Sequence, residues 1–341
     1  MCSQPSAAER ATTVAPVTRP PVLVSRRLPK PVMDRLAAEC DLTVWPEPTA
    51  MPRDLLLREA AGRRALVTLL TERIDDEVLD AAGSDLSIVA NYAVGFDNID
   101  VPACSRRGVL VSNTPDVLTE ATADMTWALL MAAARRVAEG DRFLRTGRPW
   151  IWGPEMMLGQ DVHGRTLGII GFGRIGRAVA RRATGFGMSV LYYDPVAPPA
   201  AEYGAQPTDL DELLAVADFV SVHVSLSPET HHLIDAARLR QMKPTAVLVN
   251  AARGPVVDER ALAEALDSGE IFAAGLDVFE REPAVDPGLL AHPRAVIVPH
   301  LGSATVETRL AMGTVVADNV LAALAGRRPP TLVNPEVWDR R

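Results

Sequence analysis

The chain has 341 residues, enough for about two domains with separate cores. It is 48% hydrophobic and 23% charged, which is average for soluble globular proteins, and no apolar run approaches the ~20 residues of a membrane span. The net charge is −8 and no basic stripe stands out, so the average field repels phosphate backbones. We therefore expect a soluble protein that binds neither membranes nor nucleic acid.

The cysteines and the first residues bear on where the protein works. Cys2, Cys40 and Cys104 form neither a disulfide pattern nor a metal-binding pair, and the histidines show no metal-ligand spacing. Free, inert thiols are typical of a reducing cytoplasm, so we expect a cytoplasmic protein without a metal site. Residues 1–20 lack the apolar core of a secretory signal and are interpreted as a disordered tail.

Short β-branched runs alternate with helix-like stretches in the first third of the chain. The runs cover 22–25, 42–45, 65–70 and 86–90. Parallel neighbours need connections of a dozen residues or more, so this alternation predicts a parallel α/β layer. Residues 119–138 contain no Gly or Pro, which predicts one long helix with Thr119 as its cap. We expect this helix to divide the chain into halves.

A second βα series follows the turn-rich residues 146–164. Its six predicted strands cover 166–171, 189–194, 218–224, 246–250, 272–278 and 295–299. Six short strands with helices between them predict a doubly wound sheet. A helical stretch from about 305 to 325 remains, too short for a third core, and we expect it to cross back to the first domain.

A glycine motif lies between the first strand and first helix of this second series. Gly171, Gly173 and Gly176 form a GxGxxG pattern. The first glycine permits a tight turn, the second lets the backbone approach a pyrophosphate, and the third allows close helix–strand packing. A merely structural βα turn is the alternative. The placement between strand and helix favours a dinucleotide site, with phosphates at the helix N-terminus.

The coenzyme preference is predicted from Asp194, which ends the next strand. It lies near the ~20-residue offset at which an acid binds the ribose hydroxyls of the coenzyme. A 2′-phosphate there would meet a fixed negative charge, and no Arg or Lys follows in residues 195–202. NAD(H) is therefore favoured over NADP(H), although Asp194 could instead be a turn residue before Pro195.

Four charged or titratable side chains follow later strands of the second series. Arg253 comes after the strand at 246–250, Asp277 lies at the end of the strand at 272–278 with Glu282 beyond it, and His300 follows the last strand. Ligands of open α/β sheets bind beyond the carboxyl ends of the strands, so these residues should converge there. Each alone has an ordinary structural explanation, such as a surface ion pair, a loop acid or a hydrogen-bonded histidine. Together they favour a catalytic site.

With these residues in view, the chain resembles the D-isomer-specific 2-hydroxyacid dehydrogenases, and within them the glyoxylate/hydroxypyruvate reductase branch. The resemblance runs from Val22 to Asn334. Its matching segments are LVSRRLPKPVMDRL, ANYAVGFDNID at 90–100, GIIGFGRIG at 168–176, VNAARGPVVDE at 249–259, GLDVFEREP at 275–283 and PHLGSAT at 299–305.

The resemblance implies an α/β architecture of two doubly wound domains. A flavodoxin-like substrate domain would be built from 21–116 and 302–341. A Rossmann NAD-binding domain, residues 117–301, would be inserted between these parts. The family also implies a homodimer joined through the coenzyme domains.

Residue roles follow by the same resemblance. The catalytic trio falls on Arg253, Glu282 and His300, and the backbone N–H groups of Val94 and Gly95 join Arg253 in holding the substrate carboxylate. Asp277 would bind the nicotinamide carboxamide. The coenzyme set is completed by the glycine motif, Asp194 and four further positions, Arg174, Ile175, Ala251 and Gly302.

The chemistry implied is reduction of a 2-oxo acid to the D-2-hydroxy acid. A hydride moves from the nicotinamide to the carbonyl carbon while an acid, His300, protonates the oxygen. Ionised Glu282 would favour the imidazolium form, and Arg253 would hold the carboxylate in its planar fork.

The substrate loop narrows the choice of 2-oxo acid. Asn91 stands where phosphoglycerate dehydrogenases carry an arginine, so small unphosphorylated acids, glyoxylate or hydroxypyruvate, fit better. Leu70, Trp150 and Trp152 are candidate pocket walls. Two alternatives remain: a reductase of bulkier 2-oxo acids, and an NAD-sensing corepressor-like binding protein.

Overall fold

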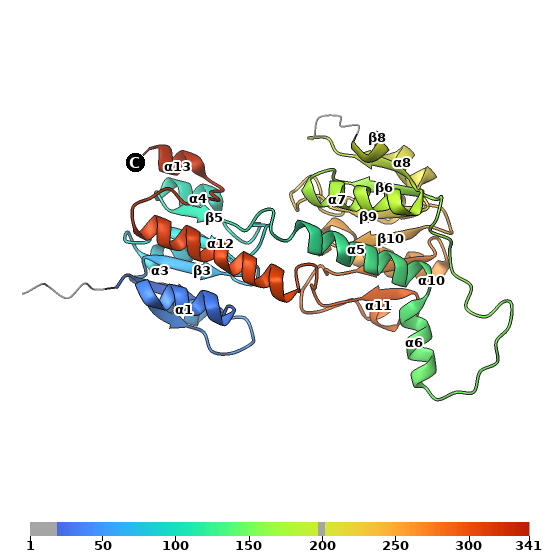
Figure 1. Ribbon diagram of the computed structural model, residues 1–341, viewed down its shortest axis with the longest axis horizontal. Coiled ribbons are helices and arrows are strands. Elements are labelled where there is room, and N and C mark those ends of the chain that lie inside the picture. The colour runs from blue at the N-terminus through green and yellow to red at the C-terminus, as the bar shows by residue number, and fades with distance from the viewer. Residues whose placement is uncertain (1–18, 197–201, 341) are drawn as a thin grey trace, which may run out of the picture.

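The computed structural model describes residues 19–196 and 202–340, which form two parallel sheets covered by helices (Figure 1). The predicted tail, apart from its last two residues, and Cys2 lie outside the described residues. Within the described ranges, no helix combines the length and apolarity needed to cross a membrane. The two-sheet α/β class agrees with the sequence prediction.

The first sheet has the strand order β2-β1-β3-β4-β5, all parallel, which is the flavodoxin-like order. Its strands are β1 (Pro21–Val24), β2 (Asp41–Val44), β3 (Ala65–Thr68), β4 (Ile88–Asn91) and β5 (Leu110–Ser112). The connecting helices are α1 (Lys30–Glu39), α2 (Arg53–Ala60), α3 (Asp76–Ala82) and α4 (Val101–Arg106). The prediction missed β5, whose three residues are too few to show a pattern.

The second sheet has the order β12-β11-β10-β9-β6-β7-β8, a Rossmann arrangement in which the order reverses at β6 and β9. Its strands are β6 (Thr166–Ile170), β7 (Ser189–Tyr193), β8 (Gln206–Pro207), β9 (Phe219–Val222), β10 (Val247–Asn250), β11 (Ala273–Leu276) and β12 (Ala295–Ile297). The six predicted strands are all present. The seventh, β8, has two residues, one of them Pro207, and lies at the edge where proline is tolerated.

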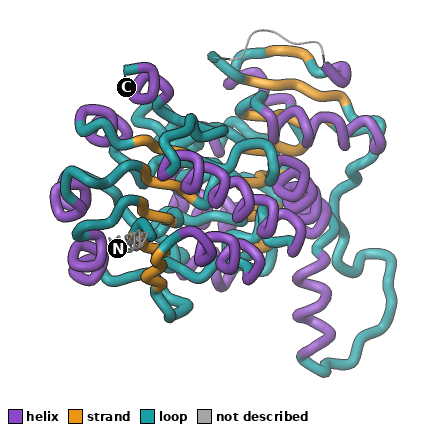
Figure 2. The backbone as a smooth tube through the Cα atoms, turned by 60° about the vertical axis from the view of Figure 1, so that its left-hand side comes forward, coloured by secondary structure: helices purple, strands orange, loops and turns teal. Residues whose placement is uncertain are grey.

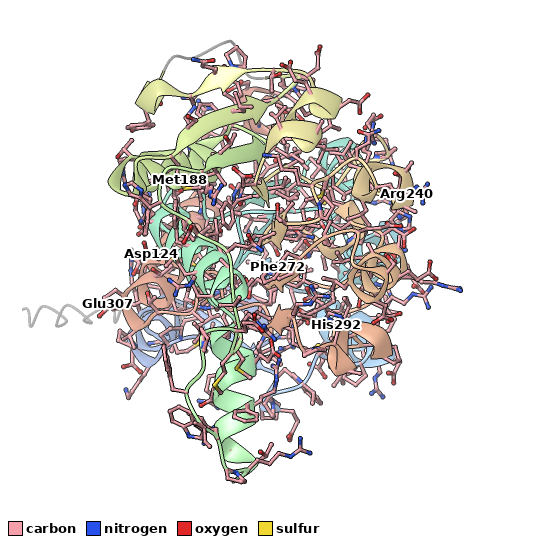
Figure 3. All side chains as sticks on the ribbon, turned by 90° about the vertical axis from the view of Figure 1, so that its right-hand side faces the viewer. Asp124, Met188, Arg240, Phe272, His292 and Glu307 are labelled. Atoms are coloured by element: carbon pink, nitrogen blue, oxygen red, sulfur yellow. The ribbon has the colours of Figure 1, made fainter. Side chains whose placement is uncertain are left out.

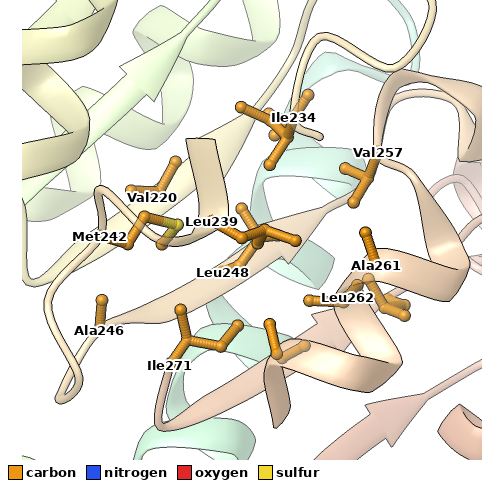
Figure 4. Close-up of a cluster of buried hydrophobic side chains, with 14 of the residues drawn as sticks. Val220, Ile234, Leu239, Met242, Ala246, Leu248, Val257, Ala261, Leu262 and Ile271 are labelled. Atoms are coloured by element: carbon orange, nitrogen blue, oxygen red, sulfur yellow. The ribbon is translucent and has the colours of Figure 1, made fainter. Parts of the chain in front are cut away.

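Helices cover both faces of the second sheet (Figures 1 and 2). They are α5 (Thr119–Ala134), α7 (Arg174–Ala183), α8 (Leu210–Val216), α9 (Ala236–Leu239), α10 (Glu259–Ser268) and α11 (Pro287–Ala291), with 3₁₀ turns η1 (Thr184–Phe186), η2 (Glu202–Gly204) and η3 (Gly254–Val256). Strands β9, β10 and β11 are buried at every position, as expected when both faces are covered. One of the two cores packs Val220 and Leu248 of the sheet against Leu239 and Leu262 of the helices (Figure 4).

The single helix predicted over 119–138 is wrong, because the chain breaks into two helices. Arg136 adopts a left-handed conformation with φ 53°, which ends α5, and α6 (Val137–Arg145) starts anew. Neither Gly nor Pro marks this break. Thr119 is also not the cap: Leu118 occupies the N-cap position without a side-chain cap. As a result, α6 and the loop after it extend away from the body (Figures 2 and 3).

The chain returns to the first sheet through α12 (Val306–Leu324), which packs against α1 and contacts β3, β4 and β5. The Thr305 side chain accepts a hydrogen bond from Thr308 N and caps this helix. A short last helix, α13 (Pro335–Asp339), contacts β5. Side chains of α12 and α13 thus share a core with the strands of the first sheet.

The approach of α12 to α1 depends on Gly313. A Cβ at this position would lie 2.6 Å from Cγ2 of Val32, closer than side-chain carbons pack. We expect Gly313→Ala to lower the free energy of unfolding by about 1–3 kcal/mol, measured by urea denaturation. In the double variant with Val32→Ala, which makes room, the loss should be smaller than the sum of the single losses. Strictly additive losses would contradict this contact.

Candidate active site

A cleft of about 520 Å³ lies where the carboxyl ends of both sheets meet. Its walls come from the loops after β3 and β4, from the glycine motif after β6, and from the segments after β9, β10, β11 and β12. Every catalytic residue predicted from the sequence lines it, namely Arg253, Glu282 and His300. The site is therefore shared between the two sheets.

The glycine motif has the geometry of a dinucleotide cradle. Gly171 has φ 95°, and a Cβ there would meet the His223 backbone at 2.7 Å. A Cβ on Gly176 would lie 2.2 Å from the Gly171 oxygen, so α7 packs directly on the loop. Gly173, by contrast, has nothing within 4 Å of its Cβ position and stands at the N-cap of α7. Two glycines allow tight packing and the third leaves open space at a helix N-terminus, which fits a pyrophosphate.

Asp194 follows β7, beside the glycine motif. Its carboxylate accepts hydrogen bonds from Phe172 N at 2.8 Å and from Val196 N at 2.9 Å. The carboxylate is thereby fixed next to the phosphate loop. The side chain is thus held by the turn and lies beside the cradle, while its role toward a ribose stays a prediction.

The sequence analysis missed His223, which follows β9 at the point where the strand order reverses. Its Nε2 lies 2.7 Å from the Ser221 hydroxyl, and its Nδ1 is buried with no hydrogen-bond partner within the described ranges. Burial lowers the pKa of His223 to about 3, so the ring is neutral. The sequence analysis placed His223 inside the strand predicted at 218–224 and found no metal-ligand spacing for it, so it gave this residue no role.

Arg253 bridges the two halves of the cleft. Its Nε donates to Asp97 Oδ1 at 2.9 Å and its Nη1 donates to the Ala252 carbonyl at 2.8 Å. Its Nη2 would lie 1.7 Å from any Cβ on residue 95, so only Gly95 lets the guanidinium reach the loop. Asp97 takes Nε and the Ala252 carbonyl takes one N–H of Nη1, which leaves Nη2 as a donor for a ligand carboxylate.

The loop that faces Arg253 is held from behind by two asparagines. Asn113 Nδ2 donates to the Val94 carbonyl at 2.7 Å and Asn91 Nδ2 donates to the Gly95 carbonyl at 2.8 Å. Within the described part of the chain, the amides of Val94 and Gly95 have no protein acceptor. Asn91 is fully buried and does not line the cleft, so it braces the loop rather than facing a ligand.

His300 and Glu282 form a hydrogen-bonded pair on the opposite wall. The His300 Nδ1 lies 3.0 Å from Glu282 Oε2, while Glu282 Oε1 accepts from Phe279 N at 3.1 Å. Burial acts to raise the pKa of Glu282, but the bond and charge of His300, the Phe279 amide and Arg253 outweigh it and hold the pKa below its usual range. Glu282 is therefore an anion that fixes the imidazole and leaves Nε2 as its second functional nitrogen.

Asp277 supports the loop that carries His300. It is 1% exposed, and its carboxylate accepts hydrogen bonds from the amides of Leu301 and Gly302. Burial raises the pKa of Asp277, against the effects of these amides and of His300. A Cβ on Gly302 would lie 3.0 Å from Asp277 Oδ2, so the glycine allows this close packing. The side chain predicted to bind a carboxamide is thus also a structural anchor.

Most other predicted positions also reach the cleft. Arg174, Ile175, Ala251 and Leu70 line it, and Arg174 pairs with Asp116 at 2.6 Å. Trp150 and Trp152 do not line it: their exposed fractions are 54% and 77%, and they lie in the loop after α6. Among the cleft residues that the sequence analysis missed are Asp97, His223 and Arg309, because each depends on contacts between distant segments.

The neutral, buried His223 makes stability depend on pH. An unfolded histidine takes up a proton below about pH 6.5, whereas folded His223 does so only near pH 3. Between these values the unfolded chain binds more protons, so the free energy of unfolding falls as the pH falls, by about 2 kcal/mol from pH 7 to 5. His223→Asn should remove this part of the slope, measured by urea denaturation at each pH.

A matched control is His163→Asn, since His163 is exposed. It should keep the wild-type slope. If His223→Asn and wild type lose stability in parallel between pH 7 and 5, the buried neutral ring is not the cause.

Comparison with known proteins agrees with this geometry. The family model for the D-isomer specific 2-hydroxyacid dehydrogenase NAD binding domain matches residues 127–302. A glyoxylate reductase of Thermococcus kodakarensis is 52% identical over 94% of this chain and 97% of its own length. One from Pyrococcus furiosus is 50% identical, with coverages of 94% and 96%.

Solved structures are similar as well. A Thermus thermophilus protein superposes with a TM-score of 0.87 at 47% identity, covering 92% of this chain and 99% of that one. An NADPH-dependent glyoxylate/hydroxypyruvate reductase from Sinorhizobium meliloti, solved with NADP and malonate, has a TM-score of 0.80 at 34% identity, with coverages of 93% and 97%. With a dinucleotide cradle, a family model across half the chain and relatives matching almost all of it, the chain belongs to the D-isomer specific 2-hydroxyacid dehydrogenases and is an oxidoreductase that uses a nicotinamide coenzyme.

Proposed function

We propose that this enzyme reduces a small 2-oxo acid, glyoxylate or hydroxypyruvate, to the D-2-hydroxy acid with a reduced nicotinamide coenzyme. The observation that most directly supports this function is one cleft. In it the His300–Glu282 pair, the free edge of Arg253 and the glycine cradle come together. The names of the curated relatives, glyoxylate reductases at about 50% identity, support the substrate.

The coenzyme supplies a hydride when it is bound. Arg253 and the amides of Val94 and Gly95 then hold the substrate carboxylate, because Arg253 Nη2 and the two amides have no protein acceptor within the described ranges. The Nε2 of His300 gives a proton to the carbonyl oxygen, while Glu282 holds Nδ1 and stabilises the charged ring. Fixing the carboxylate and the acid on opposite walls orients the carbonyl between them.

For the domains, we propose the boundaries expected from the sequence. Residues 21–116 and 302–341 would form the substrate domain, and 117–301 the coenzyme domain. This division is supported by α12, which packs on the first sheet, and by α5, which contacts β10, β11 and α7 of the second. Ala251, Asp277 and Gly302 are proposed to contact the coenzyme, Asp277 at its nicotinamide end, and the support is that all three line the cleft.

For the coenzyme, we propose NAD(H) over NADP(H). The support is the carboxylate of Asp194, fixed beside the cradle by Phe172 N and Val196 N. A phosphate on the ribose would approach this negative charge directly.

We propose a homodimer joined through the coenzyme domains. The support is the segment formed by α6 and the loop to residue 161, whose large apolar side chains face solvent. Exposed fractions reach 91% for Ile151, 77% for Trp152 and 60% for Leu158. Apolar patches of this kind usually mark a protein–protein contact.

A cytoplasmic location is proposed on the state of the thiols. Cys40 and Cys104 are free and buried. Burial raises the pKa of Cys40 to about 11 and that of Cys104 to about 12, so both are inert thiols of the kind that a reducing compartment preserves.

The function is tested by following NADH and NADPH consumption with glyoxylate, hydroxypyruvate, pyruvate and phenylpyruvate. We expect the highest kcat/KM with glyoxylate or hydroxypyruvate.

His300→Ala should lower kcat by 10²–10⁴-fold, the range of general acid catalysis, while the Kd for NADH changes little. Retained turnover with weakened NADH binding would contradict the assigned role.

Asp194 is tested through coenzyme selectivity. Asp194→Ala should raise the ratio of kcat/KM with NADPH to that with NADH at least ~10-fold, because the repelling charge is removed. Asp194→Asn keeps an acceptor for the turn but no charge, and should shift the ratio in the same direction. Asp211→Ala, an exposed acid of α8, is the control and should leave it unchanged. An unaltered ratio in the Asp194 variants would refute the ribose assignment.

A further inference from the structure

We infer that the cleft has a second anion-binding group, Arg309, and that the enzyme therefore also reduces 2-oxo acids that carry a second carboxylate. This inference rests on the proposed function for its hydride and its proton. It extends that function to a substrate class for which Arg253 binds one carboxylate and Arg309 the other.

Arg309 lies in the first turns of α12, on the substrate-domain wall of the cleft. Its guanidinium carbon stands 6.0 Å from the centre of the Tyr92 ring, and the Tyr92 hydroxyl donates to the Arg309 carbonyl at 2.6 Å. The guanidinium carbon therefore lies over the Tyr92 ring, and the Tyr92 hydroxyl is also a hydrogen-bond partner of the Arg309 side chain. A guanidinium has five N–H donors, so one such partner leaves others available for a planar anion.

The charges of the cleft leave Arg309 without an acidic partner. Of the four carboxylates that line it, Asp97 pairs with Arg253, Asp116 with Arg174 and Glu282 with His300. The fourth, Asp277, accepts from the amides of Leu301 and Gly302. Among the residues that the structure describes, no Asp or Glu oxygen lies within 4.0 Å of the Arg309 guanidinium, whose charge is permanent.

Tyr92 does not neutralise this charge. Burial raises the pKa of Tyr92 above its ordinary value, with Arg309 acting in the opposite direction, so the phenol is uncharged near neutral pH. A cation that faces a cleft of about 520 Å³ beside the carboxylate-binding loop can pair with an anionic group of a ligand. Glyoxylate has a single carboxylate, which Arg253 takes, and leaves Arg309 unused.

The reaction balances as for the smaller acids. A hydride from the reduced coenzyme adds to the C2 carbonyl carbon, the carbonyl π electrons move to the oxygen, and His300 supplies the proton. Ketomalonate becomes tartronate, and oxaloacetate becomes malate.

The test compares the full-length wild type with Arg309→Met, Arg309→Lys and a control, Arg327→Met. Arg327 is an exposed arginine just beyond the other end of α12. The kcat/KM is measured with glyoxylate, ketomalonate, oxaloacetate and 3-phosphohydroxypyruvate. We expect wild type to reduce a dicarboxylate, and Arg309→Met to lower the ratio of its kcat/KM to that of glyoxylate about 10- to 100-fold. Lysine should restore part of the ratio, and the control should keep it.

Three results would overturn the inference. Wild type could reduce glyoxylate but neither dicarboxylate. Arg309→Met could lower kcat/KM equally for every substrate, which is the signature of a structural role against Tyr92. The dependence on Arg309 could also appear with the phosphorylated acid alone, which would assign the group to phosphate instead.

A binding measurement tests the second anion site independently of the proposed reductase activity. If wild type reduces none of these acids, the proposed function fails, and titration calorimetry of the NADH-loaded protein with tartronate and glycolate decides on Arg309. Tartronate binding at least ~10-fold tighter than glycolate in wild type, with that advantage lost in Arg309→Met, supports the second anion site. Equal Kd ratios in the two proteins refute it.

Discussion

The contact between Arg253 and the loop around Gly95 is the constraint on which the whole site depends. Arg253 follows a strand of one sheet and Gly95 follows a strand of the other, and the guanidinium touches the loop only because residue 95 has no side chain. Asp97 holds the same guanidinium through Nε. A single arginine thereby fixes the separation of the two walls and still offers one edge to a ligand.

Each wall is itself held in place by supporting polar groups. Asn91 and Asn113 hold the carbonyls of the substrate loop, so its amides point away from them. Asp277 holds the amides after His300, and Glu282 holds the imidazole. Supporting contacts of this kind are what keep reacting groups within a fraction of an ångström of their working positions. The chemistry of three residues therefore requires a larger set of buried polar ones.

The sequence predicts the parts of the site that depend on strand order alone. Carboxyl ends of parallel strands meet at one edge, so Arg253, Glu282 and His300 could be placed together before any coordinates, and the glycine spacing identified the cradle. Arg309, Asp97 and His223 could not be found in this way. Their roles depend on the angle between the two sheets and on which face of α12 packs against the first sheet. No local sequence pattern determines that angle or that face.

The break in the predicted long helix was hidden for a related reason. Arg135 and Arg136 are good helix formers, and nothing nearby resembles a stop signal. The left-handed Arg136 is held in place instead by Glu139, whose carboxylate binds the guanidinium through two hydrogen bonds of 2.7 Å. This local ion pair outweighs the helix propensity of Arg135 and Arg136, and a prediction from residue types alone does not include it.

The chain passes between the two sheets twice, once from β5 to α5 and once from β12 to α12. These two covalent connections lie at separate points and would act together as a hinge. They would oppose twisting and sliding of one half against the other, so rotation about the line that joins them would be the easiest relative motion. Since His300 lies just before one of these connections and Asp116 within the other, and both line the cleft, a rotation of this kind would change the width of the cleft.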